Sequence, residues 1–264
     1  MNKKLCIGII GGGNMGAAII GGIRKKYRVL VCEKDDKRRA FLKKNFRLSV
    51  NDLRVVVENS NVLILAVKPQ DFDAILQELK GFITNKHLVI SIAAGMTTPY
   101  IEKRLGRGVR VIRTMPNLPA QIGKGVTALC KGNSAKASDA LVAKKIFDRL
   151  GATLAVKEKD INAVTAVSGS GPAYIFNFVD CFIKAAQSLG LNEKDATSLV
   201  MQTMLGSMAL LVGSYDSPRT LCEKVTSKGG TTEAALKVFH QARFEETFTR
   251  ALKAAKKRAK ELSR

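Results

Sequence analysis

One short stretch late in the chain brings hydroxyl side chains, glycines and a lysine together. Residues 225–236 read VTSKGGTTEAAL, in which Lys228 is followed by Gly229 and Gly230. The glycines let the backbone turn, and the Ser/Thr residues ahead of Glu233 predict the start of a helix. The first N–H groups of such a helix, together with the positive end of its dipole, form a site for an anion.

A second stretch, near the start of the chain, has the spacing of a phosphate-binding turn. Gly11, Gly13 and Gly16 fit G-x-G-x-x-G between an apolar run at 4–10 and the apolar-periodic AAIIGGI. In this pattern the first glycine permits the tight turn, the second lets a pyrophosphate approach the backbone, and the third lets helix and strand pack closely. The strand–turn–helix setting predicts a dinucleotide site.

The end of the next predicted strand should distinguish NAD from NADP. Glu33 lies there, and a carboxylate suits a free ribose 2′-hydroxyl while it repels a 2′-phosphate. However, Lys34, Lys37, Arg38 and Arg39 follow directly and could hold that phosphate. These residues alone leave both cofactors open.

Three further stretches rich in glycine, proline or hydroxyl residues lie where strands end or domains should meet. They are AVKPQ (66–70), RTMPNLPA (113–120) and AVSGSGPAY (166–174). Such residues indicate backbone held close to a ligand at the carboxyl ends of parallel strands. Taken alone, each stretch is better explained by a tight turn or a domain hinge.

The elements that position these stretches alternate between apolar strands and helical patterns, which predicts a doubly wound parallel α/β sheet. The predicted strands span residues 4–10, 27–32, 62–67, 87–95 and 108–115, and two more at 125–130 and 152–156 would lie at the sheet edge with a helix at 134–149 between them.

Beyond Lys157 the pattern becomes helical, and no convincing strand remains. Helices are predicted at 160–167, 173–189, 193–212, 218–226, 232–239 and 244–262. The sequence therefore predicts a dinucleotide-binding Rossmann domain at 1–158 and an all-helical domain at 159–264. Long apolar faces such as YIFNFVDCFIKAA favour burial by a second subunit, and the alternative is a well-packed monomer.

Composition excludes several function classes. The chain of 264 residues has a formal charge of +22, and the basic excess belongs mostly to the first half. Its basic residues are scattered and match no nucleic-acid motif, so we expect a generally basic surface and no nucleic-acid partner. The five cysteines are far apart and there are only two histidines, which argues against disulfides, zinc and any other metal site, and a Ser-His-Asp triad.

The sequence also gives no strong membrane signal. Residues 5–23 are apolar and uncharged and lie close to Lys3 and Lys4, but they include seven glycines and Asn14. They therefore make a poor membrane span, and no other stretch competes with them as a candidate. We expect a cytoplasmic protein without a membrane partner.

Taken together, the motifs resemble one family. The G-x-G-x-M turn, AVKP, SIAAG, R-x-MPN-x-PA, SGSGPAY and TS-x-GGTT follow in the order found in pyrroline-5-carboxylate reductase, the last enzyme of proline synthesis. The resemblance spans residue 5 to about residue 240, and SGSGPAY and TS-x-GGTT are its most specific parts. Two positions depart from the family pattern: Lys228 and Leu118 replace the usual proline and threonine.

The resemblance implies a nicotinamide cofactor, with NADP favoured and NAD possible, and a homodimer or higher homo-oligomer. In the family, the helical domain is the dimerisation domain, and the site forms between one subunit's cofactor domain and its partner's helices. The cofactor-binding residues implied are Gly11, Gly13, Asn14, Met15, Gly16, Glu33, Lys34, Ala66, Val67, Lys68, Pro69, Ala93, Met115, Pro116 and Asn117.

The resemblance also names the anion, which is the carboxylate of the substrate Δ1-pyrroline-5-carboxylate. The implied substrate-binding residues are Ser227, Gly229, Gly230, Thr231 and Thr232. A protonated imine accepts a hydride readily, so position matters more than a strong acid. The Thr232 hydroxyl is the candidate catalytic group, which would hydrogen-bond the imine nitrogen and return a proton; a bound water is the alternative.

Two rival functions are weighed against this one. The 3-hydroxyacid dehydrogenases of similar build resemble this chain but use a lysine on the interdomain helix, whereas VSGSGPAY has none and Lys184 lies about three turns further along. A dinucleotide-sensing or nucleic-acid-binding protein would exploit the charge of +22, and its binding to DNA would resist physiological salt.

Overall fold

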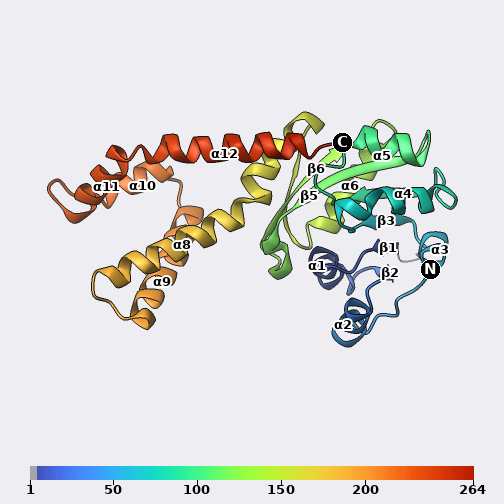
Figure 1. Ribbon diagram of the computed structural model, residues 1–264, viewed down its shortest axis with the longest axis horizontal. Coiled ribbons are helices and arrows are strands. Elements are labelled where there is room, and N and C mark those ends of the chain that lie inside the picture. The colour runs from blue at the N-terminus through green and yellow to red at the C-terminus, as the bar shows by residue number, and fades with distance from the viewer. Residues whose placement is uncertain (1–4) are drawn as a thin grey trace. The chain divides into compact units, whose positions relative to one another are not determined.

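The structure is a computed structural model and describes residues 5–264, so Lys3 and Lys4 lie outside the described residues (Figure 1). The chain divides into two compact units. The first, here called the sheet unit, runs to Pro172 and also includes Ala255–Arg264. The second, the helical unit, is Ala173–Ala254. The functional division predicted after residue 158 remains a prediction.

The sheet unit is built on seven strands in the order β2-β1-β3-β4-β5-β6-β7. All neighbouring strands are parallel except β5 and β6. The strands are β1 (Cys6–Ile10), β2 (Arg28–Cys32), β3 (Val62–Leu65), β4 (Leu88–Ser91), β5 (Arg110–Pro116), β6 (Gly125–Lys131) and β7 (Gly151–Ala155). The predicted doubly wound parallel sheet is confirmed.

Helices cover both faces of this sheet (Figure 1). They are α1 (Asn14–Ile23), α2 (Asp36–Phe46), α3 (Leu53–Glu58), α4 (Phe72–Lys80), α5 (Thr98–Leu105), α6 (Ala137–Phe147) and α7 (Ile161–Val164), with short turns η1 (Pro69–Asp71), η2 (Leu118–Ile122), η3 (Glu158–Asp160) and the π-helix η4 (Thr165–Gly169). Alternate strand residues face opposite layers, so Ile9 packs with α1 and α6 while Ile10 packs with α3, α4 and α5.

Side chains at the helix starts explain two of these helix boundaries. The Asp35 carboxylate accepts the Arg38 N–H over 2.8 Å at the start of α2. The Thr97 hydroxyl accepts the Tyr100 N–H over 3.3 Å at the start of α5. Each bond satisfies one of the N–H groups that a helix start leaves without an intrahelical partner.

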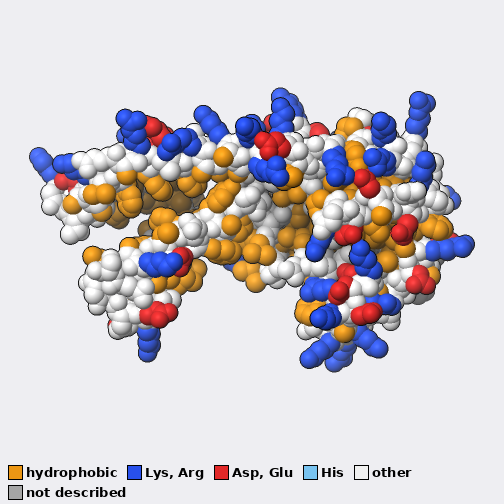
Figure 2. Space-filling model, viewed as in Figure 1, with side chains coloured by type: hydrophobic (Ala, Val, Ile, Leu, Met, Phe, Trp, Pro, Cys, Tyr) orange, Lys and Arg blue, Asp and Glu red, His pale blue; other side chains and the backbone are white. Residues whose placement is uncertain are grey.

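The helical unit is formed by the second group of helices, which are α8 (Gly171–Ser188), α9 (Glu193–Gly213), α10 (Pro218–Lys224), α11 (Thr231–Gln241) and α12 (Phe244–Glu261), with the ends of α8 and α12 in the sheet unit. Its buried hydrophobic residues are Ala186, Ala196 and Val200. Figure 2 shows hydrophobic side chains gathered on the surface of these helices.

One of these helices, α9, is long and apolar enough to cross a membrane. Its mean hydropathy is 1.4 over the best window, of which 11% is buried. The expectation that no stretch competes with residues 5–23 as a membrane candidate was therefore wrong. Apolar residues placed all round a helix suit burial by protein as well as by lipid, so composition alone does not separate the two.

Candidate active site

The glycine turn between β1 and α1 has one open position and two closed ones. Gly11 has φ 102°, and a Cβ there would lie 2.6 Å from the Ala66 carbonyl oxygen. A Cβ at Gly16 would lie 2.2 Å from the Gly11 carbonyl oxygen, whereas a Cβ at Gly13 meets nothing within 4 Å. The chain's own packing therefore requires Gly11 and Gly16, while the bare face of Gly13 leaves room for a ligand's phosphates.

A cavity of about 630 Å³ lies beside this turn, at the carboxyl ends of β1, β2 and β3. The predicted cofactor residues that line it are Gly11, Gly13, Asn14, Glu33, Lys34, Ala66, Val67 and Lys68. In an open parallel sheet, ligands bind outside the carboxyl ends of the strands. The cavity therefore has the place and the lining expected of a dinucleotide site, and the open face of Gly13 fits the pyrophosphate.

Glu33 is held by backbone groups at one side of this cavity. Its carboxylate accepts the Gly12 N–H over 2.5 Å and the Asp35 N–H over 2.9 Å. The Arg38 guanidinium donates to the Gly12 carbonyl oxygen over 2.9 and 2.7 Å, which places this cation in the lining. Both carboxylate oxygens of Glu33 are thus already hydrogen-bonded, with a cationic guanidinium close by.

Further residues line the cavity after the AVKP stretch. Gln70 is the last residue of AVKPQ, and Asp71 and Ile75 follow it. The Lys34 ammonium donates to the Asp71 carboxylate over 2.9 Å, and this hydrogen bond raises the pKa of Lys34. Pro69 marks the start of the helical turn from which Asp71 comes, because proline favours the first position of such a turn.

The remaining predicted cofactor residues do not line this cavity. Met15 packs against the core, Gly16 lies under the turn, and Pro69 begins η1. Ala93 is buried directly after β4, and Met115 and Pro116 end β5. The Asn117 side chain accepts the Val126 N–H over 2.9 Å, so it fixes the loop after β5. Because β3, β4 and β5 are parallel, the ends of β4 and β5 share the sheet edge at which the cavity opens.

The SGSGPAY stretch meets the end of β5. Its first two residues end the π-helix η4, and the Ser170 N–H that follows donates to the Thr165 carbonyl oxygen over 2.9 Å. A Cβ at Gly169 would lie 2.6 Å from the Met115 methyl group. Single π-helical turns often occur at functional sites, and this one brings two of the predicted motifs into contact.

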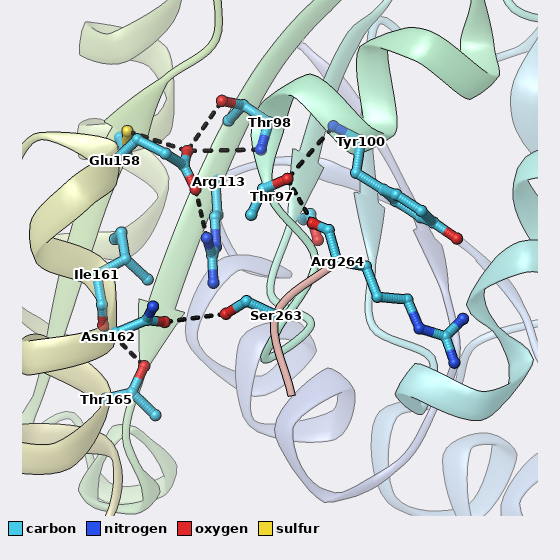
Figure 3. Close-up of polar contacts among 12 residues, drawn as sticks. Thr97, Thr98, Tyr100, Arg113, Glu158, Ile161, Asn162, Thr165, Ser263 and Arg264 are labelled. Carbon is cyan, nitrogen blue, oxygen red and sulfur yellow. Dashed lines mark hydrogen bonds and ion pairs between the residues drawn. The ribbon is translucent and has the colours of Figure 1, made fainter. Parts of the chain in front are cut away.

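A buried ion pair ties β5 to the segment that precedes η4. The Arg113 guanidinium is 3% exposed and pairs with Glu158, whose carboxylate also accepts the Thr98 hydroxyl over 2.8 Å (Figure 3). Burial, followed by the nearby Glu158 charge, raises the pKa of the Cys130 thiol to about 12. Cys130 therefore stays protonated and serves packing rather than nucleophilic chemistry.

The predicted anion site lies at the start of α11 in the helical unit. Gly229 has φ 73°, and Gly230 is the N-cap residue, without a side-chain cap. The helix begins at Thr231, ahead of Glu233, as predicted, although its N-cap residue is a glycine rather than a hydroxyl residue. Instead the Glu233 carboxylate accepts the Gly229 N–H over 2.7 Å, so the acidic residue of the first turn satisfies this donor.

The predicted substrate residues surround this helix start. A shallow cavity of about 620 Å³ is lined there by Thr226, Gly229, Gly230, Glu233, Ala234, Leu236, Lys237 and His240. Ser227, Thr231 and Thr232 do not line it. Thr232 is half-buried, whereas Thr231 and Ser227 are exposed. The first-turn N–H groups of α11 have no intrahelical partner by geometry, which is the basis for anion binding.

Among residues 5–264, no three His, Cys, Asp or Glu side chains are grouped so as to hold a metal ion. The candidate places for binding a ligand in the described residues are the glycine turn with its cavity, the ends of β4 and β5, and the start of α11.

Family models match most of the chain in two parts. A model described as pyrroline-5-carboxylate reductase dimerisation matches residues 158–262. A model described as NADP oxidoreductase, coenzyme F420-dependent, matches residues 6–95, which include the glycine turn.

Two curated relatives are similar over almost their whole length. Pyrroline-5-carboxylate reductase 2 of Bacillus subtilis is 34% identical, over 97% of this chain and 94% of that protein. The pyrroline-5-carboxylate reductase of Methanosarcina acetivorans is 37% identical, over 100% of this chain and 99% of that protein.

Solved structures agree with the curated relatives. A pyrroline-5-carboxylate reductase from Coxiella burnetii has a TM-score of 0.91 and 38% identity, covering 99% of this chain and 100% of that one. The Plasmodium falciparum enzyme, solved with NADP bound, has a TM-score of 0.88 and 27% identity over the full length of both chains. By these full-length similarities, the chain belongs to the pyrroline-5-carboxylate reductase family.

Proposed function

We propose that this protein reduces Δ1-pyrroline-5-carboxylate to L-proline with a reduced nicotinamide cofactor. The observation that carries the proposal is the glycine turn, whose one open face, at Gly13, borders a cavity at the carboxyl ends of the strands. Membership of the reductase family supports this choice of substrate. When bound, the cofactor would supply the hydride.

The cofactor is held by the turn and by the strand ends. The backbone around Gly11, Gly13 and Asn14 takes the pyrophosphate, and Ala66, Val67 and Lys68 line the next part of the cavity. The other proposed contacts at this edge are Met15, Gly16, Pro69, Ala93, Met115, Pro116 and Asn117.

We favour NADPH over NADH as the cofactor. The two Glu33 oxygens already accept backbone N–H groups, so this carboxylate is less available to a ribose 2′-hydroxyl than a free one. Lys37 and Arg38 line the same cavity, and cations attract a 2′-phosphate. The structure with NADP bound in the related Plasmodium falciparum enzyme agrees with this choice.

The substrate carboxylate binds at the start of α11. Thr231 contributes mainly its backbone N–H, and Ser227, Gly229 and Gly230 form the turn that leaves the helix start open. The half-buried Thr232 hydroxyl hydrogen-bonds the ring nitrogen and, after hydride transfer, passes a proton from solvent to it, so that the hydroxyl keeps its own proton overall. Lys228, where the family has proline, adds a positive charge beside this anion site.

The protein works as a homodimer or a higher homo-oligomer in the cytoplasm. The family's dimerisation model covers residues 158–262, and the helical unit exposes large apolar side chains, as expected of an interface. The matching region supports the functional division into a cofactor domain at 1–158 and a dimerisation and substrate domain at 159–264.

Steady-state kinetics on the Thr232→Val variant test the roles at α11. Valine keeps the size but removes a hydrogen bond to a charged or polarised partner, which typically costs about 1.5–3 kcal/mol, or roughly tenfold to more than a hundredfold in kcat/KM. Thr231→Val is the matched control and should lose much less, since its backbone N–H remains. The assay follows oxidation of NADPH or NADH with pyrroline-5-carboxylate.

Equal and small effects for both threonines would mean that a water serves the imine nitrogen. If the unmodified protein oxidises neither cofactor with this substrate, the proposed function is wrong. Comparing kcat/KM between NADPH and NADH in the same assay tests the cofactor preference.

A further inference from the structure

Residues Leu262–Arg264, which follow α12, lie across the loop that follows β4; we call these three residues the strap. The Arg264 N–H donates to the Gly95 carbonyl oxygen over 2.8 Å. The Thr97 hydroxyl donates to the Arg264 carbonyl oxygen over 2.6 Å (Figure 3). Strap and loop are thus joined through the strap's backbone, although 167 residues separate Thr97 from Arg264.

Gly95 is shaped to accept the strap. Its φ of 78° lies in the left-handed region, and a Cβ there would lie 2.4 Å from the Leu262 carbonyl oxygen. The obstacle is backbone, which cannot rotate away as a flexible side chain could. A glycine is therefore needed at this point for two independent reasons. Its backbone is left-handed, and its missing side chain makes room for the strap; the second reason exists only when the strap is in place.

Two side chains extend the strap to other elements. The Ser263 hydroxyl donates to the Asn162 side chain of α7 over 3.1 Å (Figure 3). The Arg264 guanidinium pairs over 2.9 Å with Asp73 of α4, which also accepts bonds from Tyr100 and Arg104 of α5. The strap therefore connects α4, the loop after β4 and α7.

The loop under the strap belongs to the edge where the cofactor is proposed to bind. Its first part contains Ala93, a proposed cofactor contact that is buried directly after β4. Its last part is Thr97, which caps α5. The strap holds Gly95, midway between these two residues. A loop fixed at both ends and in its middle enters the bound conformation without an ordering cost.

We propose that the strap is a positioning clamp that holds the loop after β4 ready for the cofactor. Its residues make no contact with the cofactor; they act through the path of Ala93–Thr97. This inference rests on the proposed cofactor site. Releasing the strap should weaken cofactor binding by about tenfold, since the loop must then be ordered on binding, while kcat changes little.

The sharpest test compares Gly95→Ala with Gly108→Ala in the full chain. Both glycines have left-handed backbone, with φ of 78° and 83°, so alanine is similarly strained at each. A Cβ at Gly108 meets nothing within 4 Å, whereas one at Gly95 meets the strap. Gly95→Ala should speed hydrogen exchange of Leu262–Arg264 and raise the Kd for NADPH, measured without substrate. Gly108→Ala should change neither.

A second pair of variants leaves the loop sequence intact. Arg264→Pro removes the N–H that binds the Gly95 carbonyl and should raise the Kd about as much as Gly95→Ala. Arg264→Ala keeps that N–H, loses only the pair with Asp73, and should have a smaller effect. Because the residue follows the last helix, both variants should fold even if Gly95→Ala does not.

Faster exchange of the strap with an unchanged Kd for NADPH would overturn the clamp and leave the proposed function standing. A raised Kd together with an equal fall in kcat would also overturn it, because the damage would then not be confined to cofactor binding. If the unmodified protein binds no nicotinamide nucleotide, the proposed function itself fails.

Discussion

The two units of this chain bury their apolar residues very differently. The sheet unit has a core on each face of its sheet, in which residues such as Ile9 and Leu65 are fully buried. In the helical unit the buried hydrophobic residues are Ala186, Ala196 and Val200, all of which have small or medium side chains. The sheet unit can be stabilised by its own core, whereas the helical unit needs further burial from outside itself.

The apolar residues of α9 show where that burial is needed. Met201, Leu205, Met208 and Val212 recur at intervals of four and three residues and are 44–81% exposed. This spacing makes one continuous stripe along the helix, the pattern of a helix that packs against another helix. Apolar residues on the opposite side of the helix, such as Leu199 and Leu210, add to this stripe to give α9 its membrane-like hydropathy. A second copy of the chain that packs on α9 accounts both for the exposed stripe and for the match to the dimerisation model. A membrane would account for the hydropathy alone.

The largest expected effect comes from placing charge on this stripe. Leu205→Asp combined with Met208→Asp should leave four carboxylates per dimer in an apolar interface, and unpaired buried charges cost several kcal/mol. We expect the dimer dissociation constant to rise by about a hundredfold or more and activity to fall with it. Light scattering and the NADPH assay measure the two effects.

The sheet unit supplies the control for this prediction. Val55→Asp puts a charge at a position on α3 that is 42% exposed, and it should change neither assembly nor activity. If the double aspartate variant of α9 remains a fully active dimer, the stripe is ordinary solvent-exposed surface. The helical unit would then need no further burial, and the contrast with the sheet unit would be wrong.

The next largest effect compares two glycines of the sheet unit: one that leaves room for a ligand and one that is needed for the chain's own packing. Gly13→Val adds a side chain where the chain has no atom within 4 Å, so stability should hold while the cofactor KM rises by at least about tenfold. Gly16→Ala should instead lower stability by about 1–3 kcal/mol, because its Cβ meets the Gly11 carbonyl oxygen. Thermal unfolding and cofactor kinetics on both variants check this; an unchanged cofactor KM for folded Gly13→Val would refute the cofactor site.

The strands of the sheet unit could be predicted from the sequence because most of them are deeply buried. In the sheet unit, short apolar runs between helical patterns gave all seven strands, because buried parallel strands are almost continuously apolar. The predicted strand at 87–95 was too long at its end: β4 stops at Ser91, where the chain turns toward Gly95. Strand ends are weakly encoded there, since the loop is as apolar as the strand it follows.

Other features had no local signal at all. The strap binds the β4 loop mostly through backbone atoms, and a backbone contact between distant segments leaves no residue pattern to find. The start of α11 was predicted but its glycine N-cap was not, because several hydroxyl residues precede Glu233 and propensity does not choose among adjacent candidates.

The smallest expected effect compares two ion pairs of the same kind, one in each unit. At the C-terminal end of α6 the Asp148 carboxylate accepts bonds from Lys144 over 2.8 and 2.9 Å and from the Thr153 hydroxyl over 2.6 Å. In α8 the pair is Lys184 with Asp180 over 2.6 Å, and both side chains are more than half exposed. Both pairs span one helical turn, so the extra hydroxyl and the lower exposure distinguish Asp148.

The bonds from Lys144 and then Thr153 hold the pKa of Asp148 below its ordinary value. A carboxyl whose pKa is lower in the folded than in the unfolded chain stabilises the fold above its unfolded pKa of about 4, and that contribution is lost as pH falls through the folded pKa. Solvent screening at this 39% exposed side chain keeps the contribution below about 1 kcal/mol. Asp148→Asn should therefore lower the unfolding midpoint slightly near neutral pH and by less in acid, below the ordinary carboxyl pKa of about 4. Asp180→Asn, at a more exposed pair, should have a smaller effect near neutral pH. Thermal unfolding of both variants at the two pH values measures this difference. A loss for Asp148→Asn that persists in acid would mean that the side chain contributes by packing rather than by charge.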